Sequence, residues 1–593
     1  MSKRSRSPAP LPPSKRAHRI SSNPPLSSNL PRTFDTLLYD ELILFIFSYL
    51  SFKDLCNAQL INRNWSRLSQ DNQLWKNLYI KEYGRSRLRG GKGFVKRMDG
   101  REIKALPSRA ASHHQDFVRD WKWMFRISSN WRTGRCNIAK LEEDQPPDNS
   151  LLLEMTTRER ELSDRIHMVL AGPLMIHASS RPSHSPPIVI LYPSSPPYTI
   201  HIHPAHGHLV QCTSLAVDQS PPASGISRFA VCLSSGELAA YAVSSISSSS
   251  PSPSRIHSYT PPARTARTTP IVQAAYHHPL LVTLSESFAL SLYDLSSDVM
   301  HLATHLTSFT CFPPASLVLT APDSRTYKLL VTYASPVYPK HWSIGVTEVI
   351  IVSSSSLPSS PSNSSTYPLT DHGRHFRVVS TRSVRAYDLP PGWMDETTLR
   401  AVREQWGRKV GRVAGTQTDG KWLVLAPTEL PCVSCPMSLF TSPPSSPDSS
   451  PSPSSSTSKR WEPSNMPLQL YRISFPSLPS SSPTSPSPSG GGSPKLTFVR
   501  HLYGQTGAVA GLALADGRCV SLGVDGRVWA WDLEGGEGVE VASPWEDGVM
   551  DDENEGEDPC ERLKRGMKGM VVFDERRVVS SRRGGIVVRN FDV

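Results

Sequence analysis

Large apolar side chains recur at helical spacing between residues 34 and 80. They fall on every fourth position, at Leu38, Leu42, Ile46 and Leu50. This spacing predicts a helix with one broad apolar face, and Phe45 and Tyr49 lie beside that face. Asp40 and Glu41 fall in the predicted first turn, where acidic side chains complement the helix dipole.

Further short helices are predicted in the same stretch. Ser51 followed by Asp54 resembles a capping box and predicts a helix start at about Phe52. A third helix is indicated by the spacing of Leu60, Ile61, Trp65 and Leu68. Asp71 offers a cap for a fourth, which presents Leu74, Trp75 and Leu78. A piece this small cannot bury so many apolar side chains by itself, so we expect another surface to cover some of them.

From about residue 136 the pattern changes to short alternating runs typical of β-strands. The clearest run is Cys519 to Leu533, in which two alternating segments flank Asp525-Gly526. Both of these residues tolerate the positive φ of a tight turn, so the pair predicts a hairpin. The second segment ends in Trp531-Asp532, the dipeptide that marks the third strand of a WD-repeat blade.

The same frame recurs along the chain. Tyr241 follows Gly236 by five residues, as Trp531 follows Gly526, and Tyr293-Asp294 keeps this offset behind the run Leu281 to Phe288. The chain ends in a similar run, with Gly584-Gly585 at the turn and Phe591-Asp592 in place of Trp-Asp. Weaker strand pairs are read at residues 188–203, 316–351 and 421–473.

These pairs predict an α+β multidomain chain whose all-β part is a propeller of about seven degenerate blades. A strand at the end of the chain fits ring closure. Most blades lack the full repeat signature, so an irregular pair of β-sandwiches stays as the structural alternative.

Composition divides the chain further. Ser/Pro-rich tracts at residues 244–270, 353–366, 440–460 and 476–494 predict disordered loops, because proline cannot join a central ladder. The basic tail at residues 1–33 is also expected to be disordered, and the acidic run at residues 546–558 reads as a solvated insertion.

The net charge of +12 is uneven, since residues 1–140 carry +17 and the rest of the chain −5. Lys3-Arg4 and Lys15-Arg16 resemble a bipartite nuclear import signal. Nine cysteines are sparse and odd in number, which favours a reducing compartment, and no apolar segment follows the basic start. No apolar run is long enough to cross a bilayer. We therefore expect a protein of the nucleus, the cytoplasm or both.

The helical stretch resembles the F-box family. That family reads Leu-Pro-x-Glu-Leu, Ile-Phe-Ser-Tyr-Leu, Asp-Leu, Leu-Val-Cys-x-x-Trp and Leu-Trp. Here the matching residues are Leu38, Glu41-Leu42, Ile46 to Leu50, Asp54-Leu55, Leu60-Ile61, Trp65 and Leu74-Trp75. The chain departs from the pattern at Tyr39, where the family usually has proline, and at Asn62, where cysteine is common.

The segment before the β-rich part is similar to the connector of F-box/WD-repeat proteins. Trp121-Lys122 and Asn130-Trp131-Arg132 occupy the connector pattern of that family. The resemblance implies a domain order of tail (1–33), F-box (34–80), basic loop with helical connector (81–135) and WD-repeat-like propeller (136–593).

The resemblance also implies a function. Members of this family recognise substrates for SCF-type ubiquitin ligases: the F-box docks on the Skp adaptor, which leads to cullin and RING subunits, and the propeller binds the protein to be ubiquitinated. Candidates for the adaptor face, not yet separated from the internal core, are Leu38, Leu42, Ile46, Leu50, Leu55, Leu60, Ile61, Trp65, Leu74 and Trp75.

Related propellers often read phosphorylated segments with arginines on one face. Candidates here are Arg518, Arg527, Arg582 and Arg583. Two other functions stay open. One is a Skp-bound scaffold outside a cullin complex, and the other is a basic nuclear protein that binds RNA through residues 81–135, although a lone Arg-Gly-Gly argues only weakly for RNA.

No motif predicts an enzyme, a metal or a cofactor. Cys432 and Cys435 form a lone pair without the further ligands that zinc requires. The histidines between His201 and His208 read as ordinary strand and turn residues. Gly490 to Gly492 follow serines rather than a strand, so they do not form a phosphate loop. The chain is therefore expected to be a non-catalytic subunit.

Overall fold

The computed structural model divides the chain into two compact units, Met1–Leu78 and Tyr79–Val593. We call them the helical unit and the propeller unit. The structure describes residues 34–88, 120–141, 165–192, 195–205, 208–220, 226–244, 253–261, 269–308, 310–337, 340–355, 374–387, 392–428, 467–476, 494–505, 507–515, 517–542, 569–582 and 585–593.

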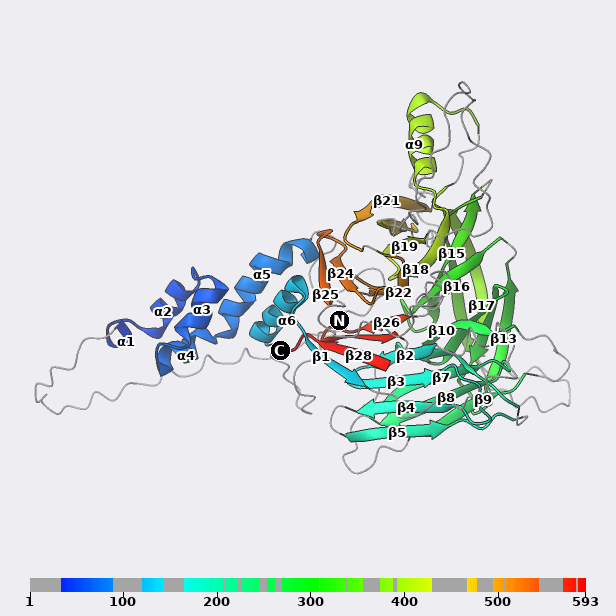
Figure 1. Cartoon of the computed structure of the whole chain (residues 1–593), viewed down its shortest axis with the longest axis horizontal. Coiled ribbons are helices and arrows are strands. Elements are labelled where there is room, and N and C mark those ends of the chain that lie inside the picture. The colour runs from blue at the N-terminus through cyan, green and yellow to red at the C-terminus, as the bar shows by residue number, and fades with distance from the viewer. Residues whose placement is uncertain are drawn as a thin grey trace, which may run out of the picture. The chain divides into compact units, whose positions relative to one another are not determined.

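Short helices build the helical unit (Figure 1). They are α1 (Phe34–Leu37), α2 (Asp40–Phe47), α3 (Phe52–Ala58), α4 (Arg63–Ser69) and the start of α5 (Asn72–Leu88). The predicted caps are confirmed: Ser51 Oγ accepts a hydrogen bond from Asp54 N at 3.3 Å, and Asp71 Oδ1 accepts one from Gln73 N at 2.8 Å. The helix that Asp71 caps is 17 residues long rather than short, and Leu60 and Ile61 precede α4 in a turn instead of lying within a helix.

The propeller unit consists of seven four-stranded antiparallel sheets, here called blades. Blades 1 to 3 are β2 (Ile166–Ala171), β3 (Leu174–Ser179), β4 (Pro187–Tyr192), β5 (Ser195–His201); β6 (Cys212–Val217), β7 (Ile226–Leu233), β8 (Leu238–Ser244), β9 (Ser254–Tyr259); and β10 (Ile271–His277), β11 (Leu280–Ser285), β12 (Ala289–Asp294), β13 (His301–Thr307). Blades 4 and 5 are β14 (Phe312–Thr320), β15 (Thr326–Val337), β16 (His341–Ser355), β17 (Arg374–Arg385); and β18 (Arg412–Thr418), β19 (Trp422–Thr428), β20 (Leu468–Ser474), β21 (Lys495–Leu502). Blades 6 and 7 are β22 (Val509–Ala515), β23 (Arg518–Gly523), β24 (Val528–Asp532), β25 (Gly538–Ala542); and β26 (Met570–Phe573), β27 (Arg577–Arg582), β28 (Gly585–Asn590) with β1 (Asn137–Leu141).

The ring is closed by strands from the two ends of the propeller unit. β1 pairs antiparallel with β28, with Asn137 opposite Asn590, so blade 7 is completed by the first strand of the unit. The first strand of each blade contacts the first strand of the next, and β26 of blade 7 contacts β2 of blade 1. Closure through one sheet ties the start of the propeller to its end.

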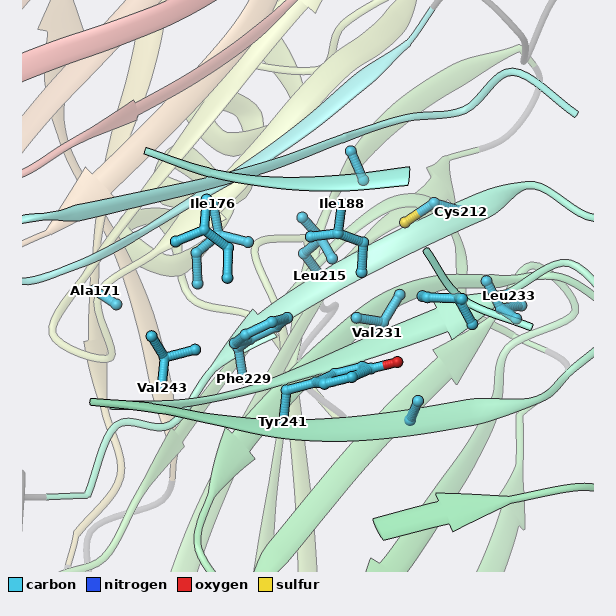
Figure 2. Packing of buried hydrophobic residues seen from close by; sticks show 14 of the residues in the cluster. Ala171, Ile176, Ile188, Cys212, Leu215, Phe229, Val231, Leu233, Tyr241 and Val243 are labelled. Carbon is cyan, nitrogen blue, oxygen red and sulfur yellow. The ribbon is translucent and has the colours of Figure 1, made fainter. Parts of the chain in front are cut away.

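The core lies between neighbouring blades. Figure 2 shows one such layer, where Ile176 and Ile188 of blade 1 face Phe229 and Tyr241 of blade 2. The rings of Phe229 and Tyr241 stack with their centroids 5.4 Å apart. Because each sheet buries apolar side chains on both faces, the repeating element is a layer of aliphatic and aromatic side chains between two sheets.

The predicted fold class is confirmed: a small helical region precedes a seven-bladed propeller. Each of the seven predicted strand pairs falls in a different blade. The alternative of paired β-sandwiches is wrong. The recurring turn frame also has a structural basis, because Gly236 and Gly526 have φ of 81° and 86°, and Phe288 occupies the same frame position with a φ of 59°.

Within the propeller unit, two further expectations were wrong. Ser254–Tyr259, inside the tract expected to be a disordered loop, forms the fourth strand of blade 2 as β9. The alternation of Ile256 with polar residues overrides the surrounding serines and prolines. Helix α9 (Glu396–Gly407), which lies between blades 4 and 5, was not predicted from the sequence. Residues 1–33, 440–460 and 546–558 lie outside the described residues.

None of the helices in the described part of the chain combines the length and the apolar character that a membrane crossing requires.

Candidate functional site

Helix α2 carries apolar side chains on both of its sides. Ile43 and Phe47 are buried. Leu42, Phe45 and Ile46 point away from that core and are exposed. A helix that is apolar all round is stable in water only when something covers it on every side. Within the helical unit, only the side with Ile43 and Phe47 is covered.

The structure divides the ten predicted adaptor residues into groups. Leu55, Leu74 and Trp75 are buried, and the Trp75 indole Nε1 donates a hydrogen bond to Ser69 O at 2.8 Å. Half-buried positions are Leu38, Leu50 and Trp65. Exposed positions are Leu42, Ile46, Leu60 and Ile61. The contrast is largest between Leu55, which is 0% exposed, and Leu60, which is 85% exposed.

Several exposed apolar residues of the same unit were not among the predicted adaptor residues. These are Phe34, Leu37, Tyr39, Phe45, Tyr49 and Phe52. Together with Leu42, Ile46, Leu60 and Ile61 they form what we call the apolar face. Single exposed apolar residues are common on proteins, but so many within one small unit mark an interaction surface. Their apolar character was visible in the sequence; their exposure was not.

Polar contacts hold the apolar face in place. Asn62, which stands where the F-box pattern commonly has cysteine, accepts a hydrogen bond from Trp65 N at 2.8 Å and caps α4. The Trp65 ring then packs edge-on between Phe34 and Phe47, at centroid distances of 5.5 and 5.3 Å. Asn62 therefore fixes the turn that presents Leu60 and Ile61.

Within the propeller unit, the connector helix α6 (Trp121–Thr133) is bound to the closing blade. Its side chains reach Asp592, which accepts hydrogen bonds from Trp123 Nε1 at 3.0 Å and Arg126 Nη2 at 2.5 Å. Asn130 Nδ2 donates to Phe591 O at 2.8 Å. The Asp592 carboxylate thus joins the end of the propeller to the helix that precedes its first strand.

Trp131 makes two further contacts between this helix and the closing blade. Its ring stacks on Phe591 with centroids 4.0 Å apart, and its Nε1 donates to Glu575 O at 2.8 Å. Gly134 ends α6 with a φ of 70°, and a Cβ there would lie 2.5 Å from Glu540 O. Only glycine fits both the backbone angle and this close approach.

The blade topology separates two faces of the propeller. The four strands of each blade alternate in direction. The turns between first and second strands therefore lie on one face of the propeller, and the connections between third and fourth strands lie on the same face. We call this the connector face, because α6 contacts Glu575 and Phe591 there. Turns between second and third strands, and the connections between blades, lie on the opposite face.

The predicted substrate arginines are split between these faces. Arg518 is on the connector face, with its guanidinium 4.7 Å from the centre of the Trp131 ring, so it supports the connector helix. Arg527 and Arg582 lie on the opposite face, at the turns of blades 6 and 7. Arg582 Nη1 is 2.6 Å from where a Cβ on Gly526 would stand, which places the two arginines on neighbouring turns. Arg583 lies outside the described residues.

Among the residues that the structure describes, no three His, Cys, Asp or Glu side chains gather as a metal-binding group. His203 follows β5 rather than extending it, and its Nδ1 lies 3.5 Å from Ser185 Oγ. Cys432, Cys435 and Gly490–Gly492 fall outside the described residues.

Two protein families match the chain. The family described as F-box-like matches residues 40–81, and the F-box protein pof12 beta-propeller matches residues 200–374. The first match covers α2 to α4 and most of the apolar face. The second runs from the end of β5 in blade 1, through blades 2 and 3, to the start of β17 in blade 4. The predicted two-part architecture, an F-box-like domain followed by an F-box-protein β-propeller, is confirmed.

Part of the chain is similar to two curated fungal proteins. It is 31% identical over 117 residues to an F-box protein of Saccharomyces cerevisiae, which covers 18% of each protein. It is 30% identical over 120 residues to the probable E3 ubiquitin ligase complex SCF subunit sconB of Arthroderma otae, again over 18% of each. The similarity spans less than a fifth of either relative.

Two solved structures also match the chain, at low TM-scores. Saccharomyces cerevisiae Sqt1 matches 72% of this chain and 96% of its own length, with 8% identity and a TM-score of 0.33. The computationally designed Ika8 protein matches the same shares with 8% identity and a TM-score of 0.29.

Proposed function

Because the chain joins an F-box-like domain to an F-box-protein β-propeller, we propose that it is the substrate-recognition subunit of an SCF-type ubiquitin ligase. The observation that carries the proposal is the apolar face of the helical unit. A helix such as α2, with Ile43 and Phe47 inside and Leu42 and Ile46 outside, needs a second apolar surface.

The proposed occupant of the apolar face is the Skp adaptor. Docking would bury Leu42, Phe45 and Ile46 on one side and Leu60 and Ile61 on the other, so affinity would come from apolar area removed from water. At roughly 25 cal/mol for each Å² buried, a few large side chains supply several kcal/mol before the costs of association. Cullin and RING subunits would join through the adaptor.

The propeller would hold the substrate on the face opposite the connector. α6 and Arg518 occupy the connector face, while Arg527 and Arg582 lie on the other. Arg527 contacts the carboxylates of Asp525 and Glu540 at 3.5 and 3.8 Å, and its guanidinium is partly accessible. Arginines in such positions suit acidic or phosphorylated segments.

Transfer chemistry would belong to a recruited conjugating enzyme. This chain would act by positioning, since holding a substrate near the reactive thioester raises the effective concentration of its lysines. We further propose that it works in the nucleus, the cytoplasm or both, on the strength of the basic pairs Lys3-Arg4 and Lys15-Arg16 and the sparse cysteines.

Affinity purification with a matched pair of variants tests the proposal. Ile61 of the apolar face and Val379 on β17 of the propeller are both 60% exposed. Ile61→Asp and Val379→Asp therefore place the same charge on apolar side chains of equal exposure. We expect adaptor and cullin with the wild-type chain and with Val379→Asp, and loss of both with Ile61→Asp because docking would desolvate the new charge.

Each remaining outcome has a distinct meaning. Adaptor without cullin on the wild-type chain would select the scaffold function instead. Equal retention of the adaptor by Ile61→Asp and Val379→Asp would exclude the apolar face as the docking surface. Wild-type chain without either partner would refute the ligase proposal as a whole.

A further inference from the structure

Helix α9 is an element that the ring itself does not require. It lies in the connection between blades 4 and 5, which places it on the face opposite the connector, and Figure 1 draws it standing clear of the seven blades. Connections between blades need only a few residues. This capped helix is therefore an insertion on the propeller face that is proposed to hold the substrate.

The C-terminal end of α9 is fixed to two blades. Trp342 on β16 and Val410 exchange backbone hydrogen bonds of 2.8 and 2.9 Å. Gln469 Nε2 on β20 donates to Arg408 O at 2.9 Å, and the Arg408 guanidinium lies 4.3 Å from the centre of the Phe498 ring. These contacts hold the base of the helix, so its position relative to the propeller is set.

One side of α9 is apolar but incompletely covered. Leu399, Val402 and Trp406 follow helical spacing, and each is only half-buried. Of these, Trp406 packs on Tyr387 with centroids 5.2 Å apart. Just before the helix, Trp393 is 98% exposed. Trp393 stands three residues before a helix with a partly covered apolar stripe, and its indole has no packing partner in the described part of the chain.

Basic side chains flank this stripe. Arg400 and Arg403 are one turn apart next to the apolar side, and Arg412 follows at the start of β18. All three are exposed, and within the described ranges no ion pair engages them. Of the neighbouring acids, Asp395 caps the helix by accepting from Thr398 N at 3.1 Å and Glu404 pairs with Arg408 at 3.3 Å. Glu396 is exposed in the first turn, four residues before Arg400, so three exposed arginines outnumber one exposed carboxylate without such a role. The accessible charge beside the stripe is positive.

We propose that α9 and Trp393 bind an acidic peptide segment that carries a large apolar side chain, within the protein that the propeller recognises. The apolar side chain of the peptide would pack on Trp393 and on the Leu399–Val402 stripe. The carboxylates of the peptide's acidic residues would pair with Arg400 and Arg403. This inference rests on the proposed function in one respect, namely that the peptide belongs to a substrate of the ligase. Binding of the peptide to α9 does not depend on adaptor docking.

The structure favours an acidic protein segment over the two other anionic partners, single-stranded nucleic acid and an anionic membrane surface. Binding of single-stranded nucleic acid relies on several aromatic rings that stack bases, and Trp406 is already engaged by Tyr387 and by Lys409 Nζ, 4.0 Å from its ring centre. A membrane-surface helix needs a wide apolar side, whereas the stripe on α9 is narrow and half-covered.

The test is direct binding of labelled synthetic peptides to the full-length chain, measured by fluorescence anisotropy. A two-by-two set of equal length varies acidity and apolar content independently: glutamates with leucine and phenylalanine, glutamates alone, glutamines with leucine and phenylalanine, and glutamines alone. We expect the acidic apolar peptide to bind at least about tenfold more tightly than the other three.

Variants then assign that preference to α9. Arg400→Glu with Arg403→Glu should abolish the acidic preference, and Trp393→Ala should abolish the apolar preference, each weakening the acidic apolar peptide about tenfold. Arg255→Glu with Arg325→Glu is the matched control, since both arginines are exposed, Arg255 on β9 of blade 2 and Arg325 in a connector-face turn of blade 4. This control should leave binding unchanged.

Clear outcomes would overturn the assignment. Equal affinity for all four peptides, or equal weakening by the control variant, would refute it. So would tighter α9-dependent binding of anionic vesicles or single-stranded RNA. Binding that appears only when residues 546–558 are replaced by Gly and Ser would identify the chain's own acidic run as the occupant. Adaptor co-purification by the α9 variants reports separately on the proposed function.

Discussion

The helical unit and the propeller unit treat their apolar side chains in opposite ways. In the propeller, each blade covers its neighbour, and layers such as the one around Phe229 and Tyr241 are closed on both sides. In the helical unit, α2 has one covered side, with Ile43 and Phe47, and one open side, with Leu42 and Ile46. The closed unit covers its own apolar side chains, while the open one leaves several of them exposed.

The difference follows from geometry rather than from composition. A ring of sheets has no free end, so every sheet face meets another sheet. A few short helices offer too little surface to cover one another. The inner core of the helical unit, with Leu55 and Trp75, is nevertheless buried.

The sharpest test of the comparison contrasts two leucines of the helical unit. Leu55→Asp puts a charge at a site with no exposed surface and also removes core packing, so we expect a loss of more than about 5 kcal/mol and unfolding of the helical unit. Leu60→Asp, at an exposed site, should change stability by less than about 0.5 kcal/mol. Hydrogen exchange of the helical unit measures both. Equal protection in the two variants would contradict the division into core and apolar face.

The next test contrasts two tryptophans of the propeller unit. Trp131→Ala removes a buried ring stacked on Phe591 and leaves a cavity, so we expect a loss of about 3 to 5 kcal/mol and weaker protection of blade 7. Trp393→Ala, at an exposed site, should leave the thermal unfolding midpoint unchanged. A large drop in Tm for Trp393→Ala would mean that α9 contributes to the core rather than to a binding surface.

The smallest of the three effects is a pH dependence confined to the propeller unit. Burial lowers the pKa of both His167 and His177 to about 4 from an ordinary 6.5, with Arg165 adding to the effect on His167. Between those values the unfolded chain binds protons that the folded chain does not. The stability that these histidines contribute is therefore complete above pH 6.5 and is lost as the pH falls toward 4.

At pH 5 this loss should be about 2 kcal/mol for each histidine, and so about 3 to 4 kcal/mol in total, relative to pH 7. The helical unit has no histidine within residues 34–78, so it should not share this dependence. Replacing both histidines by glutamine should flatten the stability profile of the propeller between pH 7 and 5. An unchanged profile in that double variant would assign the acid sensitivity to other groups.

Much of the propeller could be predicted because its signal is local. Alternation around Asp525-Gly526 identifies a hairpin from a dozen residues. One predicted strand pair of this kind, with or without the Asp-Gly turn, falls in each blade. Phe288 shows the limit of that reasoning, because its positive φ could not be inferred from a residue type that rarely adopts it. The helix α9 was missed because its few apolar positions, Leu399, Val402 and Trp406, lie in a region dominated by strand patterns.

The candidate site was only half predictable. Sequence identified apolar residues in the F-box stretch, but Leu55 and Leu60 look equivalent until the fold shows which one faces inward. Arg518 was chosen for its place near a blade turn, and only the topology shows that this turn lies beside Trp131. The burial of a side chain, and the face of the propeller on which a residue lies, depend on contacts between segments far apart in the chain.

The pairing of β1 with β28 also sets an order of events during synthesis. The helical unit leaves the ribosome before the propeller unit and is free to pack around Leu55 while most of the propeller is still untranslated. β1 must then wait for Gly585–Asn590 before its ladder exists, and α6 waits with it for Phe591 and Asp592. A message cut short before this point yields a chain that displays the apolar face without a finished ring.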